Sequence, residues 1–232
     1  MSGEVTRRRF VSAAGAMAAL GAPGVLTTRA EEAGQSDKVK IIGLCSSPRK
    51  GKTTSAALQV CLQAAGEVSD RIETELIELA DFKIPAQVAA GIPLEEGEKD
   101  DFPSLVPRLS DPCVGGIIVG TPVYFGNMSA LCKSFIDRCT VFRKGFALSG
   151  KVGGVLAVGG NRNGGQELTI RSVQIALMAQ EMAIVGDGKP TAHTGATLWN
   201  KDDDVSWDEL GLETAKNLGR HVAEVALRMQ TT

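Results

Sequence analysis

Short apolar runs alternate with longer amphipathic stretches along most of the chain. Residues 38–44, 114–120 and 152–158 are almost continuously apolar and bounded by turn-forming residues, which is typical of strands buried on both faces of a parallel sheet. Residues 73–79 alternate as an edge strand does, and residues 182–185 form a short fifth strand. The stretches between them have helical spacing, so we expect an α/β fold in which helices cover both faces of a five-stranded parallel sheet. The predicted helices span residues 53–65, 100–109, 129–142, 166–181 and 207–228, and residues 81–99 form an excursion without strong periodicity.

The first 30 residues have the order of a secretory signal, with a basic start, an apolar middle and small residues at the end. Arg7, Arg8 and Arg9 precede an uncharged stretch over residues 10–26, and residues 28–30 read as a cleavage site. The segment TRRRFV resembles the twin-arginine signal, which directs folded proteins to an export machinery. A disordered basic tail is the alternative. We expect a signal over residues 1–30, a linker over 31–37, one domain over 38–230, and a periplasmic protein.

Composition narrows the class of protein further. With 43% apolar, 22% charged and 4% aromatic residues, the chain is neither disordered nor a polytopic membrane protein. The formal net charge of −2 divides unevenly, because residues 1–30 carry +3 and the rest carries −5, so we expect no nucleic-acid partner. The five cysteines are odd in number and lack a CxxC pair, which predicts neither a disulfide framework nor a metal site.

The first of three unusual loops lies at residues 45–55, between the first strand and the first helix. It holds three cations, five hydroxyls and a helix N-terminus, which are groups that bind a phosphate dianion. The segment 46–53 also misses the nucleotide-triphosphatase loop by one residue, since Ser46 stands in place of its first glycine. Such a hydrolase needs a strand-end aspartate for magnesium, and no strand ends in a suitable one. The hydrolase therefore stays a competing hypothesis, beside that of a plain solvated turn.

Two further loops follow the third and fourth strands, and ligands of such sheets bind beyond the carboxyl ends of the strands. Residues 121–128 (TPVYFGNM) contain the only tyrosine of the chain beside a phenylalanine, which suggests a surface for a flat ring. Residues 158–167 contain four glycines, whose N–H groups can approach the polar edge of a ring. A lone aromatic pair is more often part of a core, but three such loops at one sheet edge favour a ligand site.

The three loops together resemble the flavodoxin-like NAD(P)H-dependent FMN reductase family, and within it the iron–sulfur flavoproteins. The resemblance spans residues 38–190, and its most specific part is the second loop followed by residues 133–138 (KSFIDR). It implies a flavodoxin-like three-layer sandwich, non-covalently bound FMN, and NAD(P)H as a candidate electron donor. By position, the phosphate would be bound by Ser47, Arg49, Lys50, Thr53 and Thr54, and the ribityl chain and ring would lie against Pro122, Val123, Tyr124, Phe125, Gly126, Asn127, Gly159, Gly160 and Gly165.

One departure concerns the cysteines that bind the cluster of the iron–sulfur flavoproteins. The segment 86–99, where the resemblance would place them, contains no cysteine, so we expect no iron–sulfur cluster there. The segment would instead form a lid or a subunit contact. Because relatives are commonly dimers or tetramers that complete the flavin site across an interface, the resemblance also implies a homo-oligomer.

The expected function is that of an FMN-dependent oxidoreductase, of the NAD(P)H:FMN or quinone reductase type, that transfers electrons to a small acceptor or a redox protein. The flavin carries the chemistry, and His193 and His221 are more typical of surface or capping histidines. Export argues for another donor, since nicotinamide cofactors are mainly cytoplasmic, so a non-enzymatic flavodoxin-like electron carrier is the second hypothesis. A phosphate-loop nucleotide hydrolase and a flavin-free binding domain are the remaining ones. Residues 190–207 have no predicted element or role.

Overall fold

The structure is a computed structural model that describes residues 38–230. All of these residues lie in one compact unit, Ser36–Thr232. The predicted signal over residues 1–30 and the predicted linker over 31–37 lie outside the described residues. Among the residues that are described, no helix is both long and apolar enough to cross a membrane.

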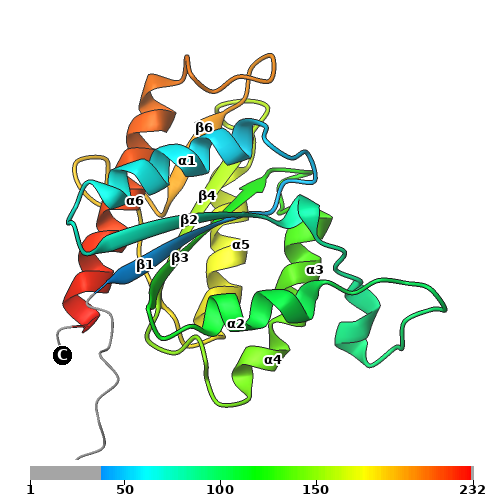
Figure 1. Cartoon of the computed structure of the whole chain (residues 1–232). Coiled ribbons are helices and arrows are strands. Elements are labelled where there is room, and N and C mark those ends of the chain that lie inside the picture. Colours follow the sequence, from blue (N-terminus) through cyan, green and yellow to red (C-terminus); the bar gives the residue numbers. More distant parts are fainter. Residues whose placement is uncertain (1–37, 231–232) are drawn as a thin grey trace, which may run out of the picture. The chain divides into compact units, whose positions relative to one another are not determined.

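A twisted parallel sheet forms the centre of the described domain, as the apolar runs predicted (Figure 1). Its strand order is β2-β1-β3-β4, and every pair of neighbours is parallel. The fifth position is shared by two short strands that pair with opposite ends of β4: β5 with its first two residues and β6 with its last four. This order reverses between β1 and β3, which is where sheets of this topology bind their ligands. The strands are β1 (Val39–Cys45), β2 (Ile72–Glu78), β3 (Val114–Pro122), β4 (Val152–Gly159), β5 (Ala183–Ile184) and β6 (Ala196–Trp199).

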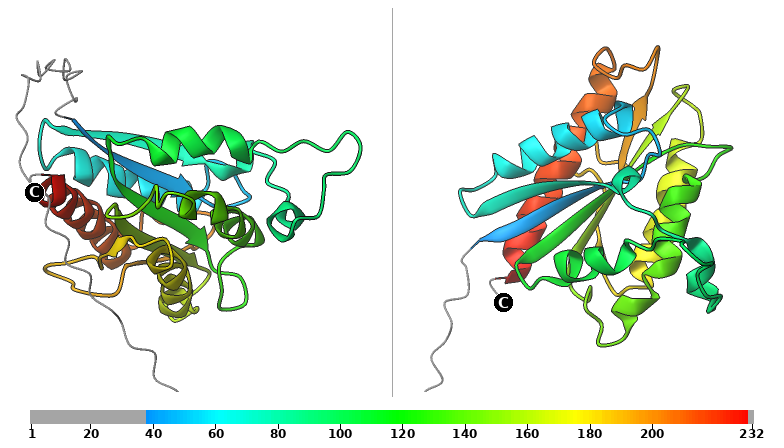
Figure 2. Two further views of the ribbon diagram at one scale, coloured as in Figure 1. Left: turned by 90° about the horizontal axis from the view of Figure 1, so that it is seen from below. Right: turned by 45° about the vertical axis from the view of Figure 1, so that its right-hand side comes forward.

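Helices cover both faces of the sheet and make the fold a three-layer sandwich (Figures 1 and 2). On one face lie α1 and α6, whose buried side chains share a core with those of β1 and β4. On the other face lie α2 to α5, around a second core that includes three phenylalanines. The helices are α1 (Thr53–Gly66), α2 (Leu105–Ser110), α3 (Ala130–Arg138), α4 (Thr140–Arg143), α5 (Gln166–Met178) and α6 (Glu209–Gln230), with short 3₁₀ turns at Leu79–Asp81, Ala86–Ala90 and Phe102–Ser104.

The contact between α1 and α6 depends on one glycine. A Cβ atom at Gly219 of α6 would lie 1.9 Å from the carbonyl oxygen of Cys61 in α1, closer than real Cβ atoms approach any neighbour. Any larger residue at position 219 would therefore force the two helices apart, and this close approach explains a glycine in the middle of a long helix.

Two predicted helices differ from the structure, and one stretch without a predicted element contains a strand. The helix expected over 129–142 breaks at Cys139, whose N–H is shared between the carbonyl oxygens of Phe135 and Ile136, as is common at a helix terminus. The helix expected over 100–109 begins as a 3₁₀ turn, and its α-helical part keeps Pro107 within its first turn, where a proline is tolerated. The stretch without a prediction, residues 190–207, contains β6.

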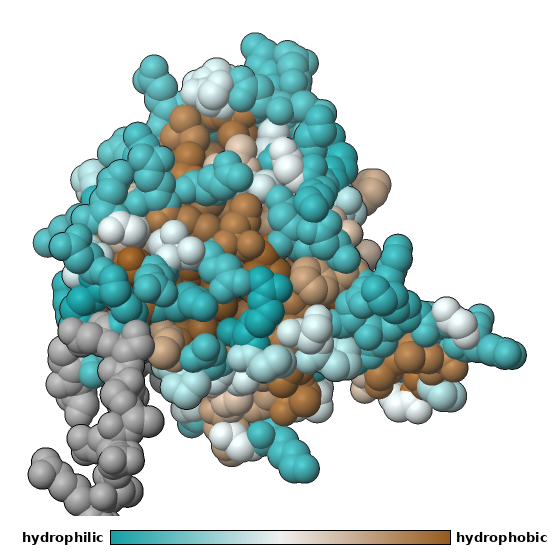
Figure 3. All heavy atoms as spheres, in the orientation of Figure 1, coloured by the Kyte–Doolittle hydropathy of each residue, from teal (hydrophilic) through white to brown (hydrophobic). Residues whose placement is uncertain are grey.

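The excursion between β2 and α2 projects from the body of the domain (Figures 1 and 2). Arg138 of α3 holds its base, because the guanidinium donates to both carboxylate oxygens of Asp100 at 3.0 and 2.7 Å and to the carbonyl of Pro85. The same guanidinium lies 4.7 Å from the ring centre of Phe102. The far part of the excursion exposes Ile92 and Leu94, and Figure 3 shows an apolar patch on this projection.

Candidate functional site

The three predicted loops meet at the carboxyl edge of the sheet, where backbone hydrogen bonds fix their positions. In the first loop, the Ser46 N–H donates to the carbonyl of Gly120 at 2.8 Å. In the second loop, the N–H of Val123 donates to the carbonyl of Val158 at 2.9 Å. The third loop contacts the second, since a Cβ at Gly165 would lie 3.0 Å from the Cα of Gly126. The expectation that three loops far apart in sequence form one surface is therefore confirmed.

The first loop turns sharply into α1 and presents backbone donors. Gly51 has φ +66°, and the hydroxyl of Ser47 accepts a hydrogen bond from the N–H of Arg49 at 3.1 Å. The helix then begins at Thr53 without a side-chain cap from Lys52. The first N–H groups of a helix have no partner inside it and favour anions. Thr53 is buried at this turn, as is its neighbour Thr54.

The cations of this loop are bound to carboxylates of the chain itself. Arg49 donates to Asp203 at 2.7 Å, and Lys52 lies 3.7 Å from the other oxygen of that carboxylate. Lys50 donates to both oxygens of Asp81 at 2.7 Å, which raises the pKa of Lys50. Hydrogen bonding from Arg49 lowers the pKa of Asp203. The cations of the loop thus bind carboxylate oxyanions of the chain itself.

A backbone donor of the same loop is also occupied. The N–H of Gly51 donates to one carboxylate oxygen of Glu78 at 3.2 Å. The second oxygen of Glu78 is buried without a hydrogen-bond partner. A buried polar atom without a partner is uncommon in a folded protein, and this one lies beside the first loop.

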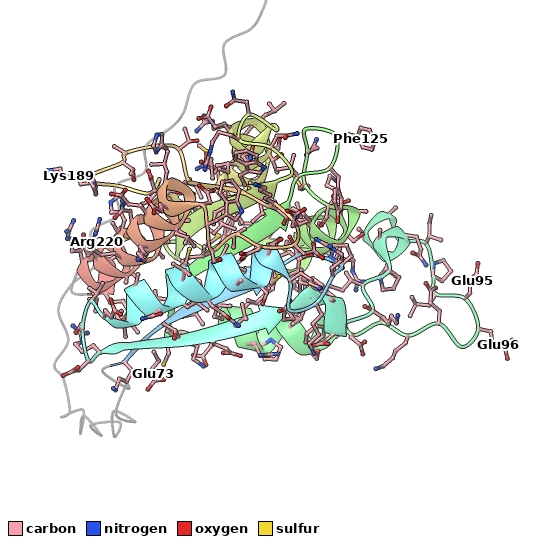
Figure 4. The ribbon with its side chains drawn as sticks, turned by 90° about the horizontal axis from the view of Figure 1, so that it is seen from above. Glu73, Glu95, Glu96, Phe125, Lys189 and Arg220 are labelled. Atoms are coloured by element: carbon pink, nitrogen blue, oxygen red, sulfur yellow. The ribbon has the colours of Figure 1, made fainter. Side chains whose placement is uncertain are left out.

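The second loop is a tight reverse turn with its aromatic side chain at the tip. Tyr124 and Asn127 exchange two backbone hydrogen bonds at 2.9 and 3.1 Å, and the residues between them have φ +51° (Phe125) and +74° (Gly126). Phe125 is fully exposed and points away from the domain (Figure 4). A bulky residue in the left-handed region is strained, and such turns favour Asn-Gly. A strained and solvated phenylalanine points to a role in binding rather than in folding.

The buried side chain of Gln166 fixes the shape of the third loop through hydrogen bonds to its backbone. The side chain of Gln166 donates to the carbonyl oxygens of Asn161 and Leu198 and accepts a hydrogen bond from the N–H of Gly164 at 2.8 Å. A Cβ at Gly159 would collide with this side chain, whereas a Cβ at Gly160 would meet nothing within 4 Å. Gly160 therefore borders open space at the edge where a ring is expected.

A fourth segment, residues 199–208, completes this edge and was not predicted. The indole N–H of Trp199 donates to the carbonyl of Gly160 at 3.0 Å, and its ring stacks edge-on against Trp207 with a centroid distance of 4.6 Å. Asp208 is buried and binds Arg162 of the third loop. Asp203, in the same segment, reaches the first loop. The acidic run 202–204 and two tryptophans in an aromatic-poor chain were the available sequence signals.

The comparison with protein families agrees with this geometry. A sequence profile described as NADPH-dependent FMN reductase matches residues 39–197. The chain belongs to the NADPH-dependent FMN reductase family. The family resemblance and the expected class of FMN-dependent oxidoreductase are confirmed, and the nucleotide-hydrolase hypothesis is withdrawn.

Two relatives show what this FMN reductase family member is similar to in sequence. The chain is 42% identical over 191 residues to an iron–sulfur flavoprotein of Methanocaldococcus jannaschii, a match that covers 81% of this chain and 97% of that one. It is 33% identical over 175 residues to an NAD(P)H dehydrogenase (quinone) of Aromatoleum aromaticum, covering 68% and 78% of the two chains.

Solved structures confirm the flavodoxin-like fold expected of an FMN reductase. A flavodoxin, WrbA-like protein from Agrobacterium tumefaciens superposes with a TM-score of 0.57 at 20% identity, covering 82% of this chain and 99% of that one. RosB with a bound flavin intermediate superposes with a TM-score of 0.65 at 14% identity, covering 84% and 81%.

The two histidines of this family member lie apart from the three loops, whereas Cys45 is the buried first residue of the first loop. His193 contacts the buried carboxylate of Asp187 at 3.2 Å, and His221 contacts the carbonyl of Gly186 at 3.0 Å, so both serve the segment between β5 and β6. At the end of β1, burial raises the pKa of the Cys45 thiol to about 12. A thiol with such a pKa stays protonated at neutral pH and does not act as a nucleophile.

Proposed function

We propose that this FMN reductase family member binds FMN at the carboxyl edge of its sheet and transfers electrons from NAD(P)H or another reduced donor to a quinone-like small acceptor. The observation that carries the proposal is the meeting of the three loops there: a loop that holds oxyanions, an exposed aromatic tip, and a glycine that borders open space. These features match three groups of FMN: its phosphate, the face of its ring and the polar edge of its ring. The quinone reductases among the relatives support the choice of acceptor.

The residues divide the binding of FMN among themselves. Bound FMN supplies hydride and one-electron transfer, so the protein needs to supply position and electrostatics. The first turn of α1 and the first loop would hold the phosphate, and the N–H groups around Gly160 and Gly165 would face the polar edge of the ring. Tyr124 and Phe125 would cover the ring and guide a flat acceptor onto it.

The test compares FMN binding by the wild type with binding by Gly160→Ala. A methyl group at position 160 touches no protein atom within 4 Å, so the variant should fold normally and yet obstruct the ring. Gly66→Ala at the end of α1 is the control, because its Cβ would make an ordinary 3.9 Å contact far from the loops. We expect the protein to show flavin absorbance bands, Gly160→Ala to weaken FMN binding at least tenfold, and Gly66→Ala to bind as the wild type does.

Turnover separates an enzyme from an electron carrier. NAD(P)H oxidation in the presence of a quinone or free FMN, at many turnovers per bound flavin, supports the reductase. A protein that binds FMN and is reduced once, without turnover, is a carrier. A protein without FMN binding refutes the proposal altogether.

Three finer points belong to the same proposal. The protein holds no iron–sulfur cluster, a prediction that rests on the absence of cysteine from residues 86–99 and is tested by iron analysis of anaerobically purified protein. Among residues 38–230 no group of three or more His, Cys, Asp or Glu is placed to hold a metal ion. The protein acts as a dimer or tetramer, which light scattering measures. It is exported through the twin-arginine route, so replacing Arg7 and Arg8 by lysine should keep it out of the periplasmic fraction.

A further inference from the structure

Two groups would compete for the cations of the first loop: the carboxylate of Asp203 and the phosphate of FMN. This inference rests on the proposed binding of FMN. Asp203 reaches the loop from a segment 154 residues further along the chain. Its two carboxylate oxygens face different cations, Arg49 at 2.7 Å and Lys52 at 3.7 Å. A phosphate on the first loop would compete for these cations, of which Arg49 is the one that the family resemblance assigns to the phosphate.

The turn that presents Asp203 has an unfavourable sequence. Lys201 and Asp204 exchange two backbone hydrogen bonds at 3.0 and 2.9 Å, and the residues between them have φ +54° (Asp202) and +61° (Asp203). Such a turn favours Asn-Gly, and glycine at its second position would cost less strain. What aspartate adds at position 203 is a carboxylate directed at the phosphate loop.

The segment behind this turn holds it in place. Lys201 lies 5.7 Å from the ring centre of Trp207, and Trp207 stacks against Trp199 at the end of β6. The carboxylate of Asp204 accepts hydrogen bonds from the N–H and hydroxyl of Ser206 at 2.8 and 2.6 Å. Asp203 is therefore presented by an ordered support rather than by a free tail.

We infer that Asp203 is an internal competitor of the FMN phosphate: it neutralises Arg49 and Lys52 in the flavin-free protein and is displaced when FMN binds. Both partners of the pair are about half exposed, at 48% for Arg49 and 44% for Asp203, so the pair is weak and readily exchanged. A phosphate monoester carries nearly two negative charges and more acceptor oxygens than a carboxylate, so it outcompetes Asp203. Competition weakens FMN binding and thereby allows the apoprotein and holoprotein to interconvert.

The experiment compares FMN dissociation constants, measured by quenching of flavin fluorescence at low salt, for the wild type, Asp203→Asn and Asp202→Asn. Both variants place asparagine at a left-handed position of the same turn and remove one negative charge, but no ion pair of Asp202 with the loop is observed. We expect Asp203→Asn to bind FMN about 2- to 5-fold more tightly, in line with the strength of an exposed ion pair. Asp202→Asn should change binding by less than about 1.5-fold, as expected for an exposed charge that is partly screened by salt.

Two further measurements identify the competition as one for phosphate. Inorganic phosphate, used as a competitor of FMN, should inhibit at a lower concentration with Asp203→Asn than with the wild type. In an Arg49→Gln background, Asp203→Asn should tighten FMN binding much less, because Arg49, the nearer of the two cations that Asp203 contacts, is absent.

The outcomes are distinct. If Asp203→Asn binds FMN as weakly as the wild type or more weakly, or if Asp202→Asn tightens binding equally, Asp203 is not a competitor. If no variant binds FMN, the proposed function is wrong and the inference falls with it.

Discussion

Replacing Asp208 by alanine should destabilise the domain more than any other substitution of a single carboxylate at the loop edge. Asp208 is 2% exposed and caps the start of α6, where one carboxylate oxygen accepts the N–H of Gly211 at 3.0 Å. The other oxygen accepts the N–H of Trp199 at 2.8 Å, and the carboxylate also binds Arg162. One side chain thus joins β6, α6 and the third loop.

The magnitude follows from these contacts. Loss of the helix cap costs about 1 kcal/mol. A buried N–H of Trp199 without its acceptor costs about 1–3 kcal/mol. The ion pair with Arg162, whose side chain is 34% exposed, adds at most about 1 kcal/mol. We therefore expect Asp208→Ala to lower the free energy of unfolding by about 2–5 kcal/mol.

Chemical and thermal unfolding test this value. For a domain of this size the loss corresponds to a fall in Tm of about 4–20 °C. Asp208→Asn, which keeps one acceptor oxygen, should lose about half as much, and Glu209→Gln, an exposed neighbour in the same helix turn, at most about 1 kcal/mol. A loss below about 1 kcal/mol for Asp208→Ala, or equal losses for the alanine and glutamine variants, would refute the reasoning.

Three other outcomes can be stated from the structure. Gly219→Ala should cost about 1–3 kcal/mol, because its Cβ would lie 1.9 Å from a backbone oxygen of α1, while Gly66→Ala should be neutral or slightly stabilising in the same denaturant titration. Hydrogen bonding from Arg138 lowers the pKa of Asp100, so this pair stabilises the protein fully above about pH 4 and less as the pH falls; the difference in Tm between the wild type and Asp100→Asn should therefore shrink toward pH 3. Burial raises the pKa of the thiols of Cys45, Cys61, Cys132 and Cys139, and Cys113 is the one cysteine of the five that is not fully buried, so the native protein should react quickly with maleimide at one thiol and the unfolded protein at five.

The sequence was a good guide to the buried strands and to the loops that follow them. The strands β1, β3 and β4 are buried on both faces, so nearly every position must be apolar, and a continuous apolar run identifies such a strand within one or two residues. The ends of these strands then locate the three loops at one edge. That much of the candidate site follows from local patterns.

The fourth segment could not be predicted because its role is set by tertiary contacts. Strand β6 has four residues and alternates between buried and half-buried positions, so its pattern is too short to distinguish from a loop. It is a strand because it pairs with the end of β4. In the sequence, Asp203 is only one member of an acidic run. Its proposed role depends on its contact with Arg49, 154 residues away, which no local pattern predicts.

The charges around the first loop limit what can attract a phosphate. The three cations of the loop are Arg49, Lys50 and Lys52, and the carboxylates that contact the loop are those of Glu78, Asp81 and Asp203, so the formal charges cancel. Net charge therefore does not attract the phosphate, and the backbone N–H groups of the loop and the first turn of α1 must provide most of the binding. Removing Lys50 does more than delete a contact, since it leaves the carboxylate of Asp81 beside the loop without the cation that it contacts. Lys50→Gln should thus weaken FMN binding by more than the hydrogen bond of Lys50 is worth, and the additional substitution Asp81→Asn should restore part of the loss.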